Sequence, residues 1–289
     1  MTGILMDVKR MAVHDGPGLR TTLFLKGCPL SCLWCHNPEG QRLKPEIGLF
    51  PEKCIGCGKC REVCPKGTAD RAACIACGAC ANVCTAGARK LYGREITLDE
   101  ALRIALEDRI FYGSTGGVTL SGGEPLMQAD FAAALLRELC ARGVHTAVDT
   151  CGHAPWSAFE KTLPCCGLYL FDVKHMDSEK HRAATGHGNG LILENLARLS
   201  AAGARIQVRI PLIPGVNDDE ENIIRTGEFL KGIGPEKIKL LPYHDMAHVK
   251  YRAIGMEDTL PVRPEDMMER LHRALDIMKN MDLPAYSDQ

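Results

Sequence analysis

Three cysteines near the start of the chain have the type and spacing of an incomplete iron–sulfur site. Cys28, Cys32 and Cys35 are spaced Cx3Cx2C within the stretch GCPLSCLWCH. A closed [4Fe–4S] site has four thiolate ligands. A cluster held by three leaves one iron with an open position, which by analogy with zinc separates a catalytic metal site from a structural one. The alternative for three close cysteines is a buried or zinc-bound group.

Two further groups of cysteines repeat one spacing, Cx2Cx2Cx3C, with an offset of 20 residues. The first group is Cys54, Cys57, Cys60 and Cys64, and the second is Cys74, Cys77, Cys80 and Cys84. Pro65 follows the first group, and Thr85 stands at the matching place after the second. This spacing resembles that of bacterial two-cluster ferredoxins, in which the fourth cysteine of each run ligates the other cluster. The alternative is a pair of four-cysteine zinc sites.

The resemblance to two-cluster ferredoxins implies two mixed ligand sets. One set is Cys54, Cys57, Cys60 and Cys84, and the other is Cys74, Cys77, Cys80 and Cys64. Each set is complete with four thiolates, so neither has a cysteine to spare for the open position beside Cys28.

The composition excludes several classes of partner. The 289 residues are 45 % apolar and carry a net charge of −1, with no run of Lys and Arg to bind nucleic acid. No apolar stretch reaches the roughly 18 residues of a membrane span. The first 20 residues contain no continuous apolar segment, so no signal peptide is predicted. Fifteen cysteines without a secretory signal indicate metal binding in a reducing cytoplasm.

Strand and helix patterns alternate along the rest of the chain. After a lead-in strand at 6–12, the predicted strands are 19–26, 117–120, 144–148, 168–171, 205–210 and 237–241. The predicted helices are 98–112, 131–142, 156–163, 191–202, 220–231 and 263–280. This alternation predicts an α/β fold with a parallel sheet and helices outside it. Six units are too few for a full eight-stranded barrel. The family that the chain resembles, named below, implies a partial (β/α)6 TIM-type barrel instead.

The predicted domains follow from this order. Residues 1–48 and 91–289 form the barrel, and residues 49–90 form a ferredoxin-like insert after its first strand. Polar or glycine-rich motifs follow the strand ends, and in a (β/α) barrel that face carries the active site. These motifs are Gly122-Gly123-Glu124-Pro125, Asp149-Thr150-Cys151-Gly152, Asp172-Val173-Lys174-His175 and Pro242-Tyr243-His244. Each one alone is equally a turn, a helix cap or a solvated polar residue.

Read together, the motifs resemble one family. The Cx3Cx2C spacing that ends in Trp34-Cys35-His36-Asn37 resembles the radical S-adenosylmethionine (SAM) signature. With DGPGLR, SGGEP, DTCG, FDVK, VRIPLIPGVND and LPYH, almost the whole chain resembles a glycyl radical enzyme activating enzyme. The eight insert cysteines match the subgroup with extra clusters. Its members activate enzymes such as choline trimethylamine-lyase, glycerol dehydratase, 4-hydroxyphenylacetate decarboxylase, benzylsuccinate synthase and isethionate sulfite-lyase.

This resemblance implies a specific reaction. The amino and carboxylate groups of SAM chelate the open iron, and one electron from the cluster cleaves SAM to methionine and a 5′-deoxyadenosyl radical. That radical takes a hydrogen from the Cα of a glycine in a partner glycyl radical enzyme. A flavodoxin or ferredoxin supplies the electron, directly or through the insert, and the free enzyme is expected to be a monomer. The loop Asp15-Gly16-Pro17-Gly18 is expected to help seat the partner's glycine segment.

The resemblance also implies roles for individual residues. Three [4Fe–4S] clusters are expected, and the catalytic one is held by Cys28, Cys32 and Cys35. The expected SAM-binding residues are Trp34, His36, Gly122, Gly123, Glu124, Asp149, Asp172, Lys174, Arg209 and His244. Asp149, Thr150 and Asp172 also resemble a monovalent-cation site beside the SAM carboxylate. Two other functions stay open: a radical SAM enzyme acting on a small molecule or RNA, and a ferredoxin-type electron-transfer protein.

Overall fold

A mostly parallel sheet forms the centre of the protein. The computed structural model describes residues 1–67, 71–260 and 266–288. Six strands pair in parallel in chain order: β2 (Arg20–Leu25), β6 (Gly117–Gly122), β7 (His145–Thr150), β8 (Leu168–Asp172), β9 (Ile206–Leu212) and β10 (Lys237–Pro242). These are the six strands that the sequence predicts, and their order confirms an α/β fold.

Three short or antiparallel strands extend this sheet at its edges. β1 (Thr2–Ala12) runs antiparallel to β2, and β5 (Arg94–Thr97) runs antiparallel to β1. At the other edge, β11 (Ala285–Tyr286) pairs in parallel with β10. Of β1, the sequence predicts only residues 6–12. It predicts neither β5 nor β11, because these short strands carry too few residues to show a strand pattern.

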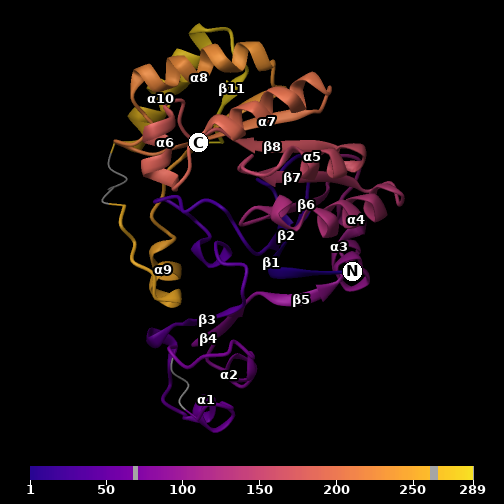
Figure 1. Cartoon of the computed structure of the whole chain (residues 1–289), viewed down its shortest axis with the longest axis vertical. Coiled ribbons are helices and arrows are strands. Elements are labelled where there is room, and N and C mark those ends of the chain that lie inside the picture. The colour runs from indigo at the N-terminus through magenta and orange to yellow at the C-terminus, as the bar shows by residue number, and fades with distance from the viewer. Residues whose placement is uncertain (68–70, 261–265, 289) are drawn as a thin grey trace.

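Six helices lie along the sheet (Figure 1). They are α3 (Leu98–Leu106), α4 (Ala129–Cys140), α5 (Trp156–Thr162), α7 (Gly190–Ala201), α8 (Glu220–Ile233) and α10 (Met267–Asn280). Residues 263–265, where the last helix is predicted to begin, lie outside the described part of the chain. Fully buried leucines from strands and helices, such as Leu120, Leu135 and Leu196, form one continuous core. No helix in the described ranges is long and apolar enough to cross a membrane.

The predicted helix over residues 98–112 is too long. The α-helix ends at Leu106, and a separate turn of 3-10 helix covers Arg109–Phe111. Ile110, which the periodicity placed on the apolar face, is 84 % exposed. Between the two elements, the Asp108 carboxylate lies 2.9 Å from the Arg10 guanidinium. Thr97 caps the start of the helix by accepting a hydrogen bond from the Glu100 amide at 3.2 Å.

Two helices that the sequence does not predict support the loops beyond the strand ends. They are α6 (Ser178–Thr185) and α9 (His248–Ile254). Neither shows an apolar period long enough to indicate a helix, because α6 is mostly polar and α9 has seven residues. Asp177 caps α6 through hydrogen bonds at 2.9 Å from the amides of Glu179 and Lys180.

The cysteine-rich segment projects from one end of the molecule (Figure 1). Its two ends are joined by an antiparallel pair, β3 (Glu46–Leu49) and β4 (Arg89–Tyr92). Two single-turn helices, α1 (Lys59–Glu62) and α2 (Ala79–Asn82), each follow a glycine with a left-handed backbone, at φ 75° and 78°. The 20-residue sequence repeat is therefore also a repeat of backbone structure.

Helix α9 connects this segment to the rest of the protein. It packs beside β3 (Figure 1). The Arg71 guanidinium donates to the carbonyl oxygen of Ile47 at 3.3 Å and to that of Ala253 in α9. Ala253 and Ile254 share a small buried cluster with Met6, Phe50 and Tyr92. One helix thus packs against the base of the insert.

Candidate active site

The cysteine loop after β2 is held by backbone hydrogen bonds on two sides. On one side, the Cys28 amide donates to the Gln41 carbonyl at 2.9 Å. On the other, the amides of Ser31 and Leu33 donate to the carbonyls of Thr185 and Ala184 at the end of α6, at 2.8 and 3.0 Å. The unpredicted helix α6 is therefore a direct support of the loop.

The loop brings its three thiols close together. Cys28, Cys32 and Cys35 lie near enough that they act electrostatically on one another. Burial raises the pKa of Cys32 to about 12 and that of Cys35 to about 11. A hydrogen bond with Cys151 lowers the pKa of Cys28. Three neighbouring, half-buried thiols fit a metal cluster, because a bound metal removes the protons that burial would otherwise retain.

The glycines after β6 are required by close backbone packing. A Cβ on Gly122, which has φ +125°, would lie 2.0 Å from the Leu25 carbonyl oxygen. A Cβ on Gly123 would lie 2.3 and 2.5 Å from the carbonyl oxygens of Gly27 and Gly40. Any side chain at these positions would push β6 away from the cysteine loop. The two glycines therefore let this strand end lie directly against that loop.

Glu124 faces the protein interior and joins two loops. Its side chain is fully buried, and one oxygen accepts from the Leu126 amide at 3.0 Å. The other accepts from the Thr150 hydroxyl at 2.8 Å and from the Cys151 amide at 2.7 Å. Burial raises the pKa of this carboxyl. Glu124 and Thr150 thus hold the loop after β7 against the loop after β6.

Asp149 and Asp172 lie close together, with the guanidinium of Arg209 between them. Arg209 Nε is 3.0 Å from Asp172 Oδ1, and a terminal nitrogen contacts Asp149. Lys174 Nζ is 2.7 Å from the other oxygen of Asp172, and the Ser121 hydroxyl donates to Asp149 at 2.7 Å. The four charged side chains are only 7 to 14 % exposed. The guanidinium of Arg209 thus supplies one positive charge that both carboxylates share.

The electrostatics of this cluster follow from its pairing. Burial raises the pKa of Asp149, although Arg209 opposes that shift. The pKa of Asp172 is lowered despite burial, because Lys174 and Arg209 both stabilise its charged form. Burial opposes the charge of Lys174, but Asp172 and then the thiol of Cys32 raise its pKa. A permanent positive charge therefore lies near the cysteine site.

His36 and His244 meet across the site. Their rings stack with centroids 4.0 Å apart, and His36 Nε2 lies 3.2 Å from the His244 carbonyl oxygen. Burial, followed by the proximity of His244, lowers the pKa of His36 to about 4, so its ring is neutral at pH 7. Trp34 is 7 % exposed and belongs to the main core. Trp34 thus packs as a core residue, while the stacked histidines link the cysteine loop to the end of β10.

Lys250 in α9 makes a contact that the sequence gives no signal for. Its ammonium lies 2.9 Å from the His36 carbonyl, 2.7 Å from Asn37 Oδ1 and 2.9 Å from Glu39 Oε1. Glu39 is almost fully buried. Through Lys250 on one side and Ala253 on the other, α9 joins the cysteine loop to the insert.

Two cavities in the insert are lined by two different sets of four cysteines. One, of about 210 Å³, is lined by Cys64, Cys74, Cys77 and Cys80 among other residues. The other, of about 250 Å³, is lined by Cys54, Cys57, Cys60 and Cys84. Each set takes three thiols from one repeat and the fourth from the other. The donor chemistry and the crossed arrangement both fit a pair of [4Fe–4S] clusters.

Comparisons with known proteins agree with this geometry. Residues 22–227 match the radical SAM superfamily. The chain is 42 % identical to the trans-4-hydroxy-L-proline dehydratase activating enzyme of Clostridioides difficile, over 94 % of this chain and 96 % of the relative. It is also 42 % identical to the isethionate sulfite-lyase activating enzyme of Nitratidesulfovibrio vulgaris, over 89 % of each chain.

A solved structure is similar as well. A domain of the pyruvate-formate lyase-activating enzyme from Bacteroides vulgatus superposes with a TM-score of 0.50 at 36 % identity. The superposition covers 60 % of this chain and 99 % of that domain.

Proposed function

The chain belongs to the radical SAM superfamily and, within it, to the glycyl radical enzyme activating enzymes, and we propose which of its residues perform each part of that activity. Such an enzyme cleaves SAM reductively and generates a glycyl radical on a partner enzyme. The relatives carry the names of a dehydratase and a lyase partner, so what they share is the class of partner. The observation that carries the assignment is the group of three neighbouring thiols beside a buried cluster of paired acidic and basic side chains.

Cys28, Cys32 and Cys35 would hold a [4Fe–4S] cluster with one open iron. When bound, such a cluster supplies the electron that cleaves the sulfonium of SAM. Around it, the backbone of Gly122 and Gly123 would accept the SAM amino group. Lys174, with its raised pKa, would remain charged and bind an anionic group of SAM.

The remaining predicted SAM-binding residues divide by what they already contact. Asp149, Asp172 and Arg209 form one charge-balanced unit, and Arg209 would orient the SAM carboxylate. His36 and His244 would offer their stacked rings and polar atoms to the nucleoside. A monovalent cation beside Asp149, Thr150 and Asp172 would share both carboxylates with Arg209. Trp34 and Glu124 would act through packing and loop placement, as their buried positions suggest.

We also propose that the six parallel strands form a partial (β/α)6 barrel and that residues 49–90 are an insert with two [4Fe–4S] clusters. The crossed cysteine sets in the two cavities support this proposal. The expected electron donor is a flavodoxin or ferredoxin, and the expected compartment is the cytoplasm. The chain would be monomeric until it meets its partner enzyme. The loop Asp15–Gly18 would help seat the glycine segment, and Asp15 is tied to β2 by the Thr22 hydroxyl at 2.8 Å.

The test is activation of a partner under anaerobic conditions. The reconstituted protein is incubated with SAM, a chemical reductant and a glycyl radical enzyme from the same organism. We expect 5′-deoxyadenosine, methionine and a doublet EPR signal on the partner, all of which Cys32→Ala abolishes. SAM cleavage with consumption of a small molecule or an RNA and no doublet would instead support the alternative radical SAM function. If the Cys32→Ala variant retained the full function of the wild type, that result would support the alternative of an electron-transfer protein.

A further inference from the structure

The two repeats of the insert share their cysteine spacing and backbone but differ in charge. Repeat one is residues 52–67, and repeat two is residues 72–87. Four basic side chains of repeat one stand where repeat two has alanine: Lys53, Lys59, Arg61 and Lys66 correspond to Ala73, Ala79, Ala81 and Ala86. Repeat one also contains Glu52 and Glu62, whereas repeat two contains no charged residue. Charge therefore distinguishes two halves that otherwise match.

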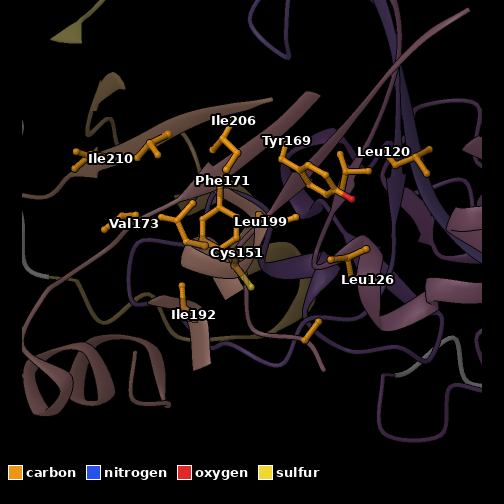
Figure 2. Packing of buried hydrophobic residues seen from close by; sticks show 14 of the residues in the cluster. Leu120, Leu126, Cys151, Tyr169, Phe171, Val173, Ile192, Leu199, Ile206 and Ile210 are labelled. Carbon is orange, nitrogen blue, oxygen red and sulfur yellow. The ribbon is translucent and has the colours of Figure 1, made fainter. Parts of the chain in front are cut away.

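The basic side chains of repeat one are not needed for the core. The main buried core, part of which Figure 2 shows around Tyr169 and Phe171, includes none of the described residues between 49 and 90. Lys53, Lys59 and Arg61 are exposed, and they form no ion pair within the part of the chain that the structure describes. The Lys53 ammonium lies 4.8 Å from the centroid of the Phe50 ring, a contact that leaves its charge in place.

A need to balance the charge of bound clusters does not explain the difference between the repeats. Both cavities are lined by four thiols, so a [4Fe–4S] cluster would carry the same charge in either one. Arg89 lines both cavities. Balance would therefore call for basic residues in both repeats, yet residues 49–90 carry seven basic and three acidic side chains, with none in repeat two.

Repeat one lies at the outer end of the insert. Figure 1 shows α1 at the lower end of the long axis of the molecule, whereas α2 packs against β4. The cavity lined by the set that contains Cys54 is lined by residues between 49 and 89, and we call it the outer cavity. The other, or inner, cavity is lined also by Arg42. Arg42 follows Gln41, whose carbonyl accepts from the Cys28 amide, so the inner cavity adjoins the segment that holds the cysteine loop.

An exposed apolar side chain lies among these charges. Ile55 is 69 % exposed and lines the outer cavity together with Lys59. Apolar contacts within a polar, charged rim are typical of a protein interface. Positive charges also raise the association rate of a negatively charged protein, and this effect falls with ionic strength. Repeat one thus offers an acidic protein a contact directly over the outer cavity.

We propose that Lys53, Ile55, Lys59 and Arg61 form the docking surface for an acidic protein that delivers one electron through the outer cluster. The inference rests on the proposed function, because it requires a cluster in each insert cavity. In the transfer, the docked protein loses one electron and the cluster in the outer cavity gains it, and no proton or chemical group moves. The inner cavity lies on the side of the candidate active site, so the charge and the geometry point in one direction.

The test measures the binding of a flavodoxin with a net negative charge to the reconstituted enzyme by anaerobic titration calorimetry. Lys53→Ala, Lys59→Ala and Arg61→Ala are combined, which gives repeat one the residues of repeat two at these positions. We expect Kd to rise about tenfold at an ionic strength of roughly 0.01 M. The difference should disappear near 1 M, because the Debye length falls from about 30 Å to about 3 Å.

A matched control removes three exposed basic side chains outside the insert. Lys231→Ala, Lys237→Ala and Lys279→Ala change α8, the start of β10 and α10. This variant should bind the flavodoxin as the wild type does. Cys57→Ala tests the point of entry: it should keep the wild-type Kd while the flavodoxin hydroquinone no longer reduces the remaining clusters at the wild-type rate in stopped-flow measurements.

A wild-type Kd in the repeat-one variant, or an equal rise in the control, would overturn the inference. Absence of flavodoxin binding to the wild type, or a repeat-one variant that loses only the glycyl radical enzyme, would do the same. If the alanine variant loses iron, Lys59→Gln with Arg61→Gln replaces it under the same criteria. The proposed function fails separately, when the wild type binds flavodoxin and cleaves SAM but forms no glycyl radical.

Discussion

The two cysteine-rich regions of this chain are built on opposite plans. In the loop after β2, the three thiols sit in a frame of backbone hydrogen bonds, buried charges and core side chains. In the insert, Cys54, Cys57, Cys74 and Cys77 are exposed, and the described residues of this segment form no large buried cluster of their own. The rest of the fold surrounds the first region, whereas it contacts the insert at its base, through α9. The second depends on its own repeat and on whatever its cysteines bind.

This contrast explains why the three cysteines of the loop after β2 and the eight cysteines of the insert would bind separate clusters. A site that must admit a substrate needs an open iron and polar groups around it, and the sheet supplies those groups from five strand ends. A site that only holds a cluster needs four thiolates and a backbone that can turn tightly around the cluster. The left-handed glycines Gly56, Gly58 and Gly78 provide that backbone in the insert.

The largest expected effect is the loss of the open site. Cys32→Ala should reduce SAM cleavage with a chemical reductant to background and remove about four of about twelve irons per chain, because each [4Fe–4S] cluster carries four. The iron count and 5′-deoxyadenosine formation are measured on the same sample. Retention of SAM cleavage would contradict the assignment of this loop.

A second prediction concerns the buried charges that only the first region has. Arg209→Met leaves Asp149 and Asp172 together without their shared cation, and breaking such a buried pair costs about 3–5 kcal/mol in the free energy of unfolding. Urea unfolding measures the change. Arg205→Met is the control, because its ion pair with Glu236 is exposed and is worth roughly 0–1 kcal/mol. Equal losses in the two variants would mean that the Arg209 cluster is not effectively buried.

Glu124→Gln should have a smaller effect on the same region. The amide cannot accept all three of the present hydrogen bonds from Leu126, Thr150 and Cys151, and one charged hydrogen bond is worth roughly 1.5–3 kcal/mol. We expect that loss in urea unfolding, together with a weaker SAM-dependent change in the EPR signal. Full stability would show that the loop after β7 does not depend on this carboxylate.

The smallest effect on SAM cleavage is expected from substitutions in the insert. Cys57→Ala combined with Cys77→Ala should leave SAM cleavage by a strong chemical reductant close to wild type, because neither thiol lies in the frame around Cys28. The same variant is then assayed with a protein electron donor. Selective loss with the protein donor identifies the insert as an electron relay, and equal rates with both reductants identify it as a scaffold.

Much of this arrangement follows from the sequence because the relevant signals are local. The six parallel strands have apolar runs that end in glycine or polar motifs, and the cysteine spacing alone separates the three-thiol site from the insert. The crossed sets lining the two insert cavities coincide with those implied by the ferredoxin spacing. Spacing is informative in the insert because one short segment supplies all eight of its thiols.

The contacts that the sequence does not predict join residues far apart in the chain. Arg209 meets Asp149 across 60 positions, and Lys250 reaches Asn37 across 213. No periodicity encodes such pairs. The sequence also does not predict the helices α6 and α9, since a polar helix and a seven-residue helix have no extended apolar face.

The most direct test of the account compares EPR spectra of the reduced enzyme with and without SAM in three proteins. In the wild type, one cluster signal should change on addition of SAM and the others should not. In Cys57→Ala with Cys77→Ala, the SAM-sensitive signal should persist, and in Cys32→Ala it should be absent while the insert signals remain. A SAM-sensitive signal that survives Cys32→Ala, or one that disappears with the insert cysteines, would contradict the division of this chain into one open site and two closed ones.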